Sequence, residues 1–273
     1  MKVGYIQFDV KHDKNENFRC IEHYLETFDG ELVVLPELCI CGYLFPNKKA
    51  LLDAAERVPC GASTLEMQKL SEKYQCIIVF GLAEKEGDHI YNTAVVVGYG
   101  KYMGKYRKVH LSDLEKTLFE RGDCNPVIDT GRFKLGIQIC FDLWFPEISR
   151  EQVKQGADIL CALANFGGET TAVIARTRAI ENLTPLIMCN RIGTEQTTQI
   201  DAYFLGKSAI LNAAGECVTA CEADCEMMSS GILKIGAKHS NVICRDFDAE
   251  MSIHPLNTKE YDTEKSAQFA QVE

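Results

Sequence analysis

The chain has 273 residues, of which 46% are hydrophobic and 25% charged, and these values exclude an intrinsically disordered or fibrous protein. Its formal net charge of −10 argues against binding to a phosphate backbone, so we expect no nucleic-acid partner. No apolar run approaches the roughly 20 residues that span a bilayer, and residues 1–6 have the pattern of a strand rather than of a signal peptide. We therefore expect a cytoplasmic protein with no membrane partner.

Strand-like and helix-like segments alternate through the first half of the chain. Apolar runs predict strands at residues 3–8, 32–35, 76–80, 92–98 and 106–111, the last two as a hairpin-like pair. Residues 15–28 predict a helix because their apolar side chains recur at helical spacing. Ser63-Thr64-Leu65-Glu66 matches a capping box, which predicts a second helix that begins there and ends near Tyr74.

The alternation continues through the second half. Strands are predicted at residues 135–139, 159–164, 185–189, 208–212 and 216–220. Pro146 fits the first position of a helix that ends near Gly156, and residues 169–182 predict another helix. This pattern is typical of an α/β fold, and no linker divides it. We expect one domain over residues 1–245 and a polar C-terminal arm over 246–273, partly disordered or at an oligomer interface.

The chain contains thirteen cysteines, an odd number, and most of them lie within apolar runs. Reduced thiols packed in the core are the simplest interpretation of that pattern. Cys39 and Cys41 form a C-x-C pair, and Cys217, Cys221 and Cys225 recur every four residues. Neither group is a C-x-x-C pair and no histidine lies near the second, so we predict no metal site and no cofactor.

Cys140 differs from the other cysteines because it directly follows a predicted strand and precedes a polar segment. Its side chain is therefore expected at the mouth of a sheet. Glu37 also follows a predicted strand, and Lys108 lies within another. Strand ends converge in layered α/β folds, so these three side chains can meet and support acyl transfer through a thioester. Taken alone, a solvated turn at Glu37 and a basic surface patch around Lys108 are equally good interpretations.

Three segments resemble the signature motifs of the nitrilase superfamily of carbon–nitrogen hydrolases. They are Leu35-Pro36-Glu37-Leu38, Tyr106-Arg107-Lys108-Val109-His110-Leu111 and Ile139-Cys140-Phe141-Asp142-Leu143-Trp144-Phe145-Pro146-Glu147, in the order and at separations like those of the family. Further matches lie at residues 3–9, 178–182, 190–193 and 206–210. The resemblance covers roughly residues 3–220 and favours the amidase-like branch. Beyond residue 220 the chain departs from the C-terminal pattern of the family.

The resemblance implies a four-layer α-β-β-α sandwich and a cofactor-free Glu–Lys–Cys triad. Glu37 is then the general base, Lys108 the oxyanion stabiliser and Cys140 the nucleophile. Many family members carry a second glutamate between the Lys and Cys motifs; Glu115 is the best match for it, and Glu120 competes for that role. The positive charge of Lys108 is expected to favour the Cys140 thiolate.

Other residues near the ends of these motifs are candidates for the substrate pocket. They are Tyr43, Phe141, Trp144, Asn165 and Phe166. The backbone N–H of Phe141 is also expected to donate to the oxyanion. An aromatic residue near a strand end is often a core residue, so each candidate has that alternative.

The expected activity is hydrolysis of a small linear amide, or of a carbamoylated amine, with release of ammonia. A nitrilase or an amide-forming acyltransferase would use the same triad, so both stay open. A non-catalytic binding protein on the same fold and a cysteine-rich metal protein are alternatives from other classes. We expect a small-molecule amide as substrate and a homodimer or higher homo-oligomer.

Overall fold

The fold is that of a computed structural model, which describes residues 1–198, 200–236 and 243–253. Two six-stranded sheets form the centre of the described chain. The first contains, in spatial order, β14 (Met227–Ile232), β1 (Lys2–Gln7), β2 (Leu32–Val34), β3 (Ile77–Glu86), β4 (His89–Gly98) and β5 (Lys101–Arg107). The second contains β13 (Cys217–Ala220), β12 (Ala209–Leu211), β9 (Leu186–Asn190), β8 (Ile159–Ala164), β7 (Lys134–Ile139) and β6 (Val127–Asp129).

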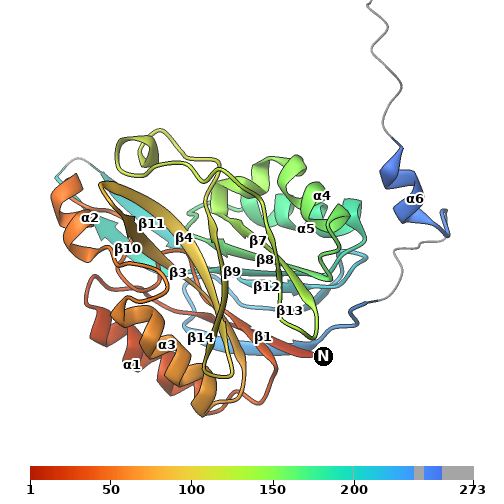
Figure 1. Cartoon of the computed structure of the whole chain (residues 1–273), viewed down its shortest axis with the longest axis horizontal. Helices are drawn as coiled ribbons and strands as arrows, with labels where there is room; N and C mark the ends of the chain where they lie inside the picture. Colours follow the sequence, from red (N-terminus) through yellow and green to blue (C-terminus); the bar gives the residue numbers. More distant parts are fainter. Residues whose placement is uncertain (199, 237–242, 254–273) are drawn as a thin grey trace, which may run out of the picture.

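Helices cover the outer faces of both sheets, as Figure 1 shows. Helices α1 (Lys14–Leu25) and α3 (Ala62–Lys73) lie on the first sheet, and α4 (Pro146–Lys154) and α5 (Thr170–Asn182) lie on the second. The shorter helices are α2 (Lys48–Ala54), α6 (Phe247–Ser252) and the 3₁₀ turns η1 (Glu115–Thr117) and η2 (Cys140–Trp144). The predicted four-layer sandwich in a single domain is confirmed. None of the helices in the described ranges has the length and apolarity to cross a bilayer.

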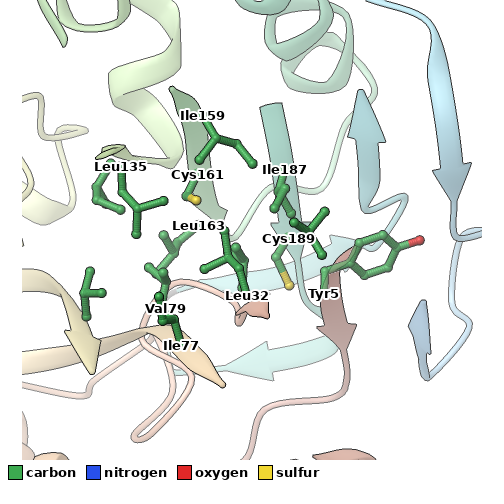
Figure 2. Packing of buried hydrophobic residues seen from close by; sticks show 14 of the residues in the cluster. Tyr5, Leu32, Ile77, Val79, Leu135, Ile159, Cys161, Leu163, Ile187 and Cys189 are labelled. Carbon is green, nitrogen blue, oxygen red and sulfur yellow. The ribbon is translucent and has the colours of Figure 1, made fainter. Parts of the chain in front are cut away.

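The inner strands bury both of their faces. In β1, Val3 and Tyr5 pack between the two sheets, whereas Ile6 packs under helices α1 and α3. Figure 2 shows the layer between the sheets, where side chains of both sheets, among them Leu32 and Leu163, point toward one another. Strands buried on both faces read as continuous apolar runs, and for this reason they were recognisable in the sequence.

The predicted capping box at residues 63–66 is wrong. Helix α3 begins at Ala62, and its N-cap, Gly61, has no side chain to accept a hydrogen bond. The carboxylate of Glu56 instead accepts from the backbone N–H and the hydroxyl of Ser63, at 2.7 and 2.6 Å. The Glu56 carboxylate thus accepts a hydrogen bond from a backbone N–H in the first turn of the helix, where a negative charge is favourable.

Strand β5 ends at Arg107, so the predicted strand at 106–111 was placed too late in the chain, although its pairing with β4 is confirmed. The hairpin of β10 (Ile192–Gln196) and β11 (Asp201–Leu205) was not predicted at all. Helix α6 lies within the predicted C-terminal arm, where the ring of Phe247 is 6.0 Å from the guanidinium of Arg150. Residues 254–273 of the predicted arm lie outside the described residues.

Candidate active site

Glu37 lies in a tight turn that directly follows β2. The next residue, Leu38, has a φ of +49°, and the turn packs closely against β3. A Cβ atom at Gly81 of β3 would lie 2.3 Å from the backbone nitrogen of Leu38, so only glycine allows this approach. The shape of the turn therefore depends on a residue 44 positions away from Glu37 in the sequence.

Lys108 is the first residue after β5. Its backbone N–H donates to the carbonyl of Asn92 at 2.8 Å, and its carbonyl accepts from Gly122 at 2.8 Å. A Cβ atom at Gly122 would lie 2.2 Å from the carbonyl oxygen of Arg107, so here too glycine permits the contact. Hydrogen bonds thereby fix both the backbone N–H and the backbone carbonyl of Lys108.

Cys140 follows β7 and opens the 3₁₀ turn η2 with a φ of +47°, a conformation uncommon for any residue other than glycine. The buried carboxylate of Asp142 holds this turn. It accepts from the backbone N–H of Ile139 at 3.1 Å, from the Tyr106 hydroxyl at 2.8 Å and from the backbone N–H of His110 at 2.8 Å. The strained turn at Cys140 is thus tied to the segment that carries Lys108.

The side chains of Glu37, Lys108 and Glu115 form one buried cluster, each about 1% exposed. The Lys108 ammonium donates to Glu37 Oε1 at 2.7 Å and to Glu115 Oε1 at 2.5 Å. Asn92 Nδ2 donates to Glu37 Oε1 at 2.6 Å. The second oxygen, Glu37 Oε2, is buried without a hydrogen-bond partner. The motifs offered no signal for Asn92, which sequence reasoning missed as part of this cluster.

The cluster shifts the ionisation of its own members. Burial raises the pKa of Glu37 to about 7, because the lowering effect of Lys108 is partly cancelled by the negative charge of Glu115. Burial acts on Glu115 as well, but the charge and hydrogen bond of Lys108 outweigh it and lower the pKa of that carboxyl. Burial alone would depress the pKa of Lys108, yet the two carboxylates raise it well above its usual range. Lys108 therefore stays positive and Glu115 negative, while Glu37 titrates near neutrality.

Cys140 is partly exposed, and the pKa of its thiol is raised above its usual value. Burial raises its pKa, the charge of Glu37 raises it further, and the opposing effect of Lys108 is smaller than either. Lys108 thus acts on the Cys140 thiol in the expected direction, but burial and the charge of Glu37 outweigh it. Attack by this sulfur requires a base to remove its proton.

Of the two candidates for the second glutamate, Glu115 contacts Lys108 and Glu120 does not. The Glu120 side chain is half-exposed and lies 3.7 Å from His89, on the outside of the loop. Its backbone N–H donates to Ile90 at 2.7 Å.

The five candidate pocket residues differ in their surroundings. The charges of Glu115, Lys108, Glu37 and Cys140 all act on the Tyr43 phenol. Both polar atoms of the Asn165 side-chain amide are buried without a hydrogen-bond partner. Phe166 is buried, and its backbone N–H donates to the side chain of Asn190 at 3.0 Å. Trp144 is 46% exposed and its ring lies 6.1 Å from that of Phe141.

The two groups of cysteines that could suggest metal ligands differ in how far their side chains are buried. Cys39 and Cys41 are buried, whereas Cys217 is exposed, Cys221 buried and Cys225 intermediate. Among the residues that the structure describes, no three or more His, Cys, Asp or Glu side chains gather so that they would hold a metal ion.

Comparison with known proteins identifies the class to which this fold and site belong. The model of the carbon-nitrogen hydrolase family matches residues 2–237, and the chain therefore belongs to that family, within the nitrilase superfamily. The predictions of this superfamily and of a carbon–nitrogen hydrolase are confirmed.

The chain is similar in sequence or structure to relatives that carry several different names. A nitrilase from Pyrococcus abyssi is 36% identical over 221 residues, which cover 79% of this chain and 83% of that protein. An N-carbamoylputrescine amidase from Solanum lycopersicum is 28% identical, over 80% of this chain and 81% of that protein. The solved structure of a carbon-nitrogen hydrolase from Helicobacter pylori G27 is 28% identical, covers 86% of this chain and 89% of that chain, and has a TM-score of 0.80.

Proposed function

We propose that this carbon–nitrogen hydrolase cleaves a small linear amide or a carbamoylated amine, releasing ammonia through a thioester on Cys140. Two observations together carry the proposal. The Cys140 thiol has a raised pKa and needs a base to remove its proton. Burial raises the pKa of the Glu37 carboxyl group to about 7, and its Oε2 has no hydrogen-bond partner. A carboxyl with that pKa can both accept and return a proton near neutral pH.

In the first step, Cys140 Sγ attacks the carbonyl carbon of the amide while its proton moves to Glu37. The negative charge that develops on the carbonyl oxygen is met by the ammonium of Lys108 and by the backbone N–H of Phe141. A single donor of this kind lowers the barrier by on the order of 3 kcal/mol. Glu115 keeps Lys108 charged and fixed, since its carboxylate accepts a hydrogen bond from that ammonium.

In the second step, the tetrahedral intermediate collapses and Glu37 returns the proton to the departing nitrogen, so that ammonia leaves and an acyl thioester remains on Cys140. Glu37 then removes a proton from a water molecule, which attacks the thioester. The acid is released and the Cys140 thiol recovers its proton. For a carbamoylated amine the acid is a carbamic acid, which breaks down to carbon dioxide and the amine.

Nitrile hydrolysis is the second candidate activity, because the Pyrococcus relative named nitrilase is 36% identical to this chain. Names of the amidase kind occur among several other relatives, such as the N-carbamoylputrescine amidases and an omega-amidase from Arabidopsis thaliana. We rank amide hydrolysis first on that basis. A parallel panel of linear amides, carbamoylated amines and the matching nitriles separates the two.

The test measures ammonia release across this panel together with the intact mass of the protein during turnover. The proposal expects ammonia from at least one amide or carbamoylated amine and an acyl adduct on Cys140. Cys140→Ala should abolish both, and Cys217→Ala, at an exposed cysteine, should change neither. A wild-type protein that releases no ammonia from any compound and forms no adduct on Cys140 would overturn the proposal.

A further inference from the structure

The loop that carries Tyr43 is hydrogen-bonded to the β10–β11 hairpin, which lies outside the two six-stranded sheets. Glu195, on strand β10, accepts hydrogen bonds from the backbone N–H of Tyr43 at 3.1 and 3.0 Å and from that of Leu44 at 2.5 Å. The Glu195 side chain is only 6% exposed. A buried carboxylate with two successive backbone donors fixes the direction of the chain at that point.

Arg191 supports the same loop by two routes. Its guanidinium donates to Glu195, and it lies 4.3 Å above the ring of Phe204 on β11. The Phe204 ring meets the Tyr43 ring edge-on, with centroids 6.1 Å apart and planes at 87°. Arg191 is itself fully buried and donates to the carbonyl of Val10 at 2.5 Å. The β10–β11 hairpin thus contacts both the backbone and the ring of Tyr43.

The loop also fits closely around Glu195. Gly42 has a φ of +81°, and a Cβ atom there would lie 3.0 Å from Glu195 Oε1 and 2.8 Å from the His12 ring. The neighbouring carbonyl of Cys41 lies 2.9 Å from His12 Nδ1. The path of residues 41–44 is therefore determined on both sides by side chains that come from β10 and from the segment after β1.

The far end of this contact chain is the catalytic cluster. Tyr43 packs against the hydrophobic group that contains Leu38 and Leu111, the residues next to Glu37 and shortly after Lys108. Burial, together with the charge of Glu115, raises the pKa of the Tyr43 phenol. The phenol therefore stays protonated and can act as a hydrogen-bond donor.

We propose that Glu195 is a positioning residue that acts through Tyr43, by holding the phenol where it donates a hydrogen bond to an acceptor atom of the bound substrate. This inference rests on the proposed amide-hydrolysing function of the same site. The β10–β11 hairpin lies outside both six-stranded sheets. In this proposal, the hairpin orients the Tyr43 phenol for substrate binding.

A double-mutant cycle tests the inference, because a residue that acts through another has no separate effect once that other is removed. Tyr43→Phe should lower kcat/KM roughly tenfold, the effect of one lost hydrogen bond, mainly through a higher KM. Glu195→Gln should have an effect of similar size in the wild type. In the Tyr43→Phe background, the same change should alter kcat/KM by less than about twofold.

Glu56→Gln is the matched control, since Glu56 also accepts a backbone N–H and pairs with a cation, but at the start of α3. Its fold-effect should be the same in both backgrounds. Phe204→Leu provides a second cycle with Tyr43→Phe and decides the question if Glu195→Gln does not fold.

Equal effects of Glu195→Gln, or of Phe204→Leu, with and without the Tyr43 hydroxyl would mean that the hairpin only stabilises the fold, and would overturn this inference. That result requires an active wild type, so it leaves the proposed function intact. A wild type that releases no ammonia and shows no acyl adduct on Cys140 overturns the proposed function instead, and with it the substrate contact of Tyr43.

Discussion

The two carboxylate oxygens of Glu37 have different surroundings. Oε1 accepts hydrogen bonds from Lys108 and from Asn92, whereas Oε2 is buried without a partner. A buried carboxylate oxygen that lacks donors binds a proton more readily than a solvated one. The residue that we propose as the general base thus has one oxygen that is fixed in place and one that is available for proton transfer.

The ionisation of Glu37 should determine the acidic side of the pH–activity profile. Burial, opposed by Lys108, raises its pKa to about 7, and a general base acts only when it is ionised. We therefore expect kcat/KM to rise with pH through about 7 and to level off above it. A profile that stays flat over about two pH units on either side of this value would contradict the assignment.

Glu115→Gln should shift that inflection to lower pH. The negative charge of Glu115 raises the pKa of Glu37, and the neutral amide oxygen of glutamine would accept from Lys108 more weakly than the carboxylate does. Both changes stabilise the ionised form of Glu37. We also expect kcat to fall on the order of 10²-fold, because one of the two anchors of Lys108 is weakened.

The matched control is Glu120→Gln, which changes a half-exposed glutamate in the same loop. Steady-state kinetics across pH should show a wild-type inflection for this variant. An unchanged inflection in Glu115→Gln would mean that the charge of that residue does not reach Glu37.

At the scale of secondary-structure elements, the site depends on how closely the turn that carries Glu37 approaches strand β3. Gly81→Ala would insert a methyl group 2.3 Å from the backbone nitrogen of Leu38, so the turn that carries Glu37 has to move. We expect a loss of stability of about 1–3 kcal/mol from overpacking, accompanied by a fall in kcat of about 10²-fold or more.

Gly87→Ala separates stability from activity, because Gly87 has a φ of +60° in the β3–β4 turn and no atoms within 4 Å of its would-be Cβ. That variant should lose about 1 kcal/mol from backbone strain with kcat unchanged. Urea unfolding and initial rates on the same preparations provide both numbers. Wild-type kcat in a folded Gly81→Ala protein would show that the turn tolerates the shift.

The positions of Glu37 and Cys140 could be predicted because each follows an apolar strand, and buried strands are visible as apolar runs. Lys108 was recognisable by its motif alone, because β5, which precedes it, is a polar and mostly half-buried strand. The contacts around the proposed triad could not be predicted. Asn92 occupies a strand position that looks like any polar residue at the start of a strand, and Glu195 meets Tyr43 across 152 residues of sequence. The pKa of Cys140 depends first on its burial and then on the neighbouring charges of Glu37, Lys108 and Glu115, and no motif specifies their balance.

At the scale of the whole molecule, the layer between the two sheets joins them into one structure. Leu163→Ala would remove side-chain atoms from this fully buried layer and should cost about 2–5 kcal/mol of the free energy of unfolding. Val173→Ala on the outer helix α5, where Val173 is 65% exposed, should change it by less than about 0.5 kcal/mol. Comparable losses in the two variants, measured by urea unfolding, would contradict this account of the core.

The protonated resting state of Cys140 also affects how the molecule tolerates oxidation. Peroxides and alkylating agents react with thiolates far faster than with thiols. Burial and the charge of Glu37 raise the pKa of this thiol, which lowers the fraction of thiolate at neutral pH. If Cys140 is the nucleophile that we propose, its dependence on Glu37 should also slow its irreversible oxidation between turnovers.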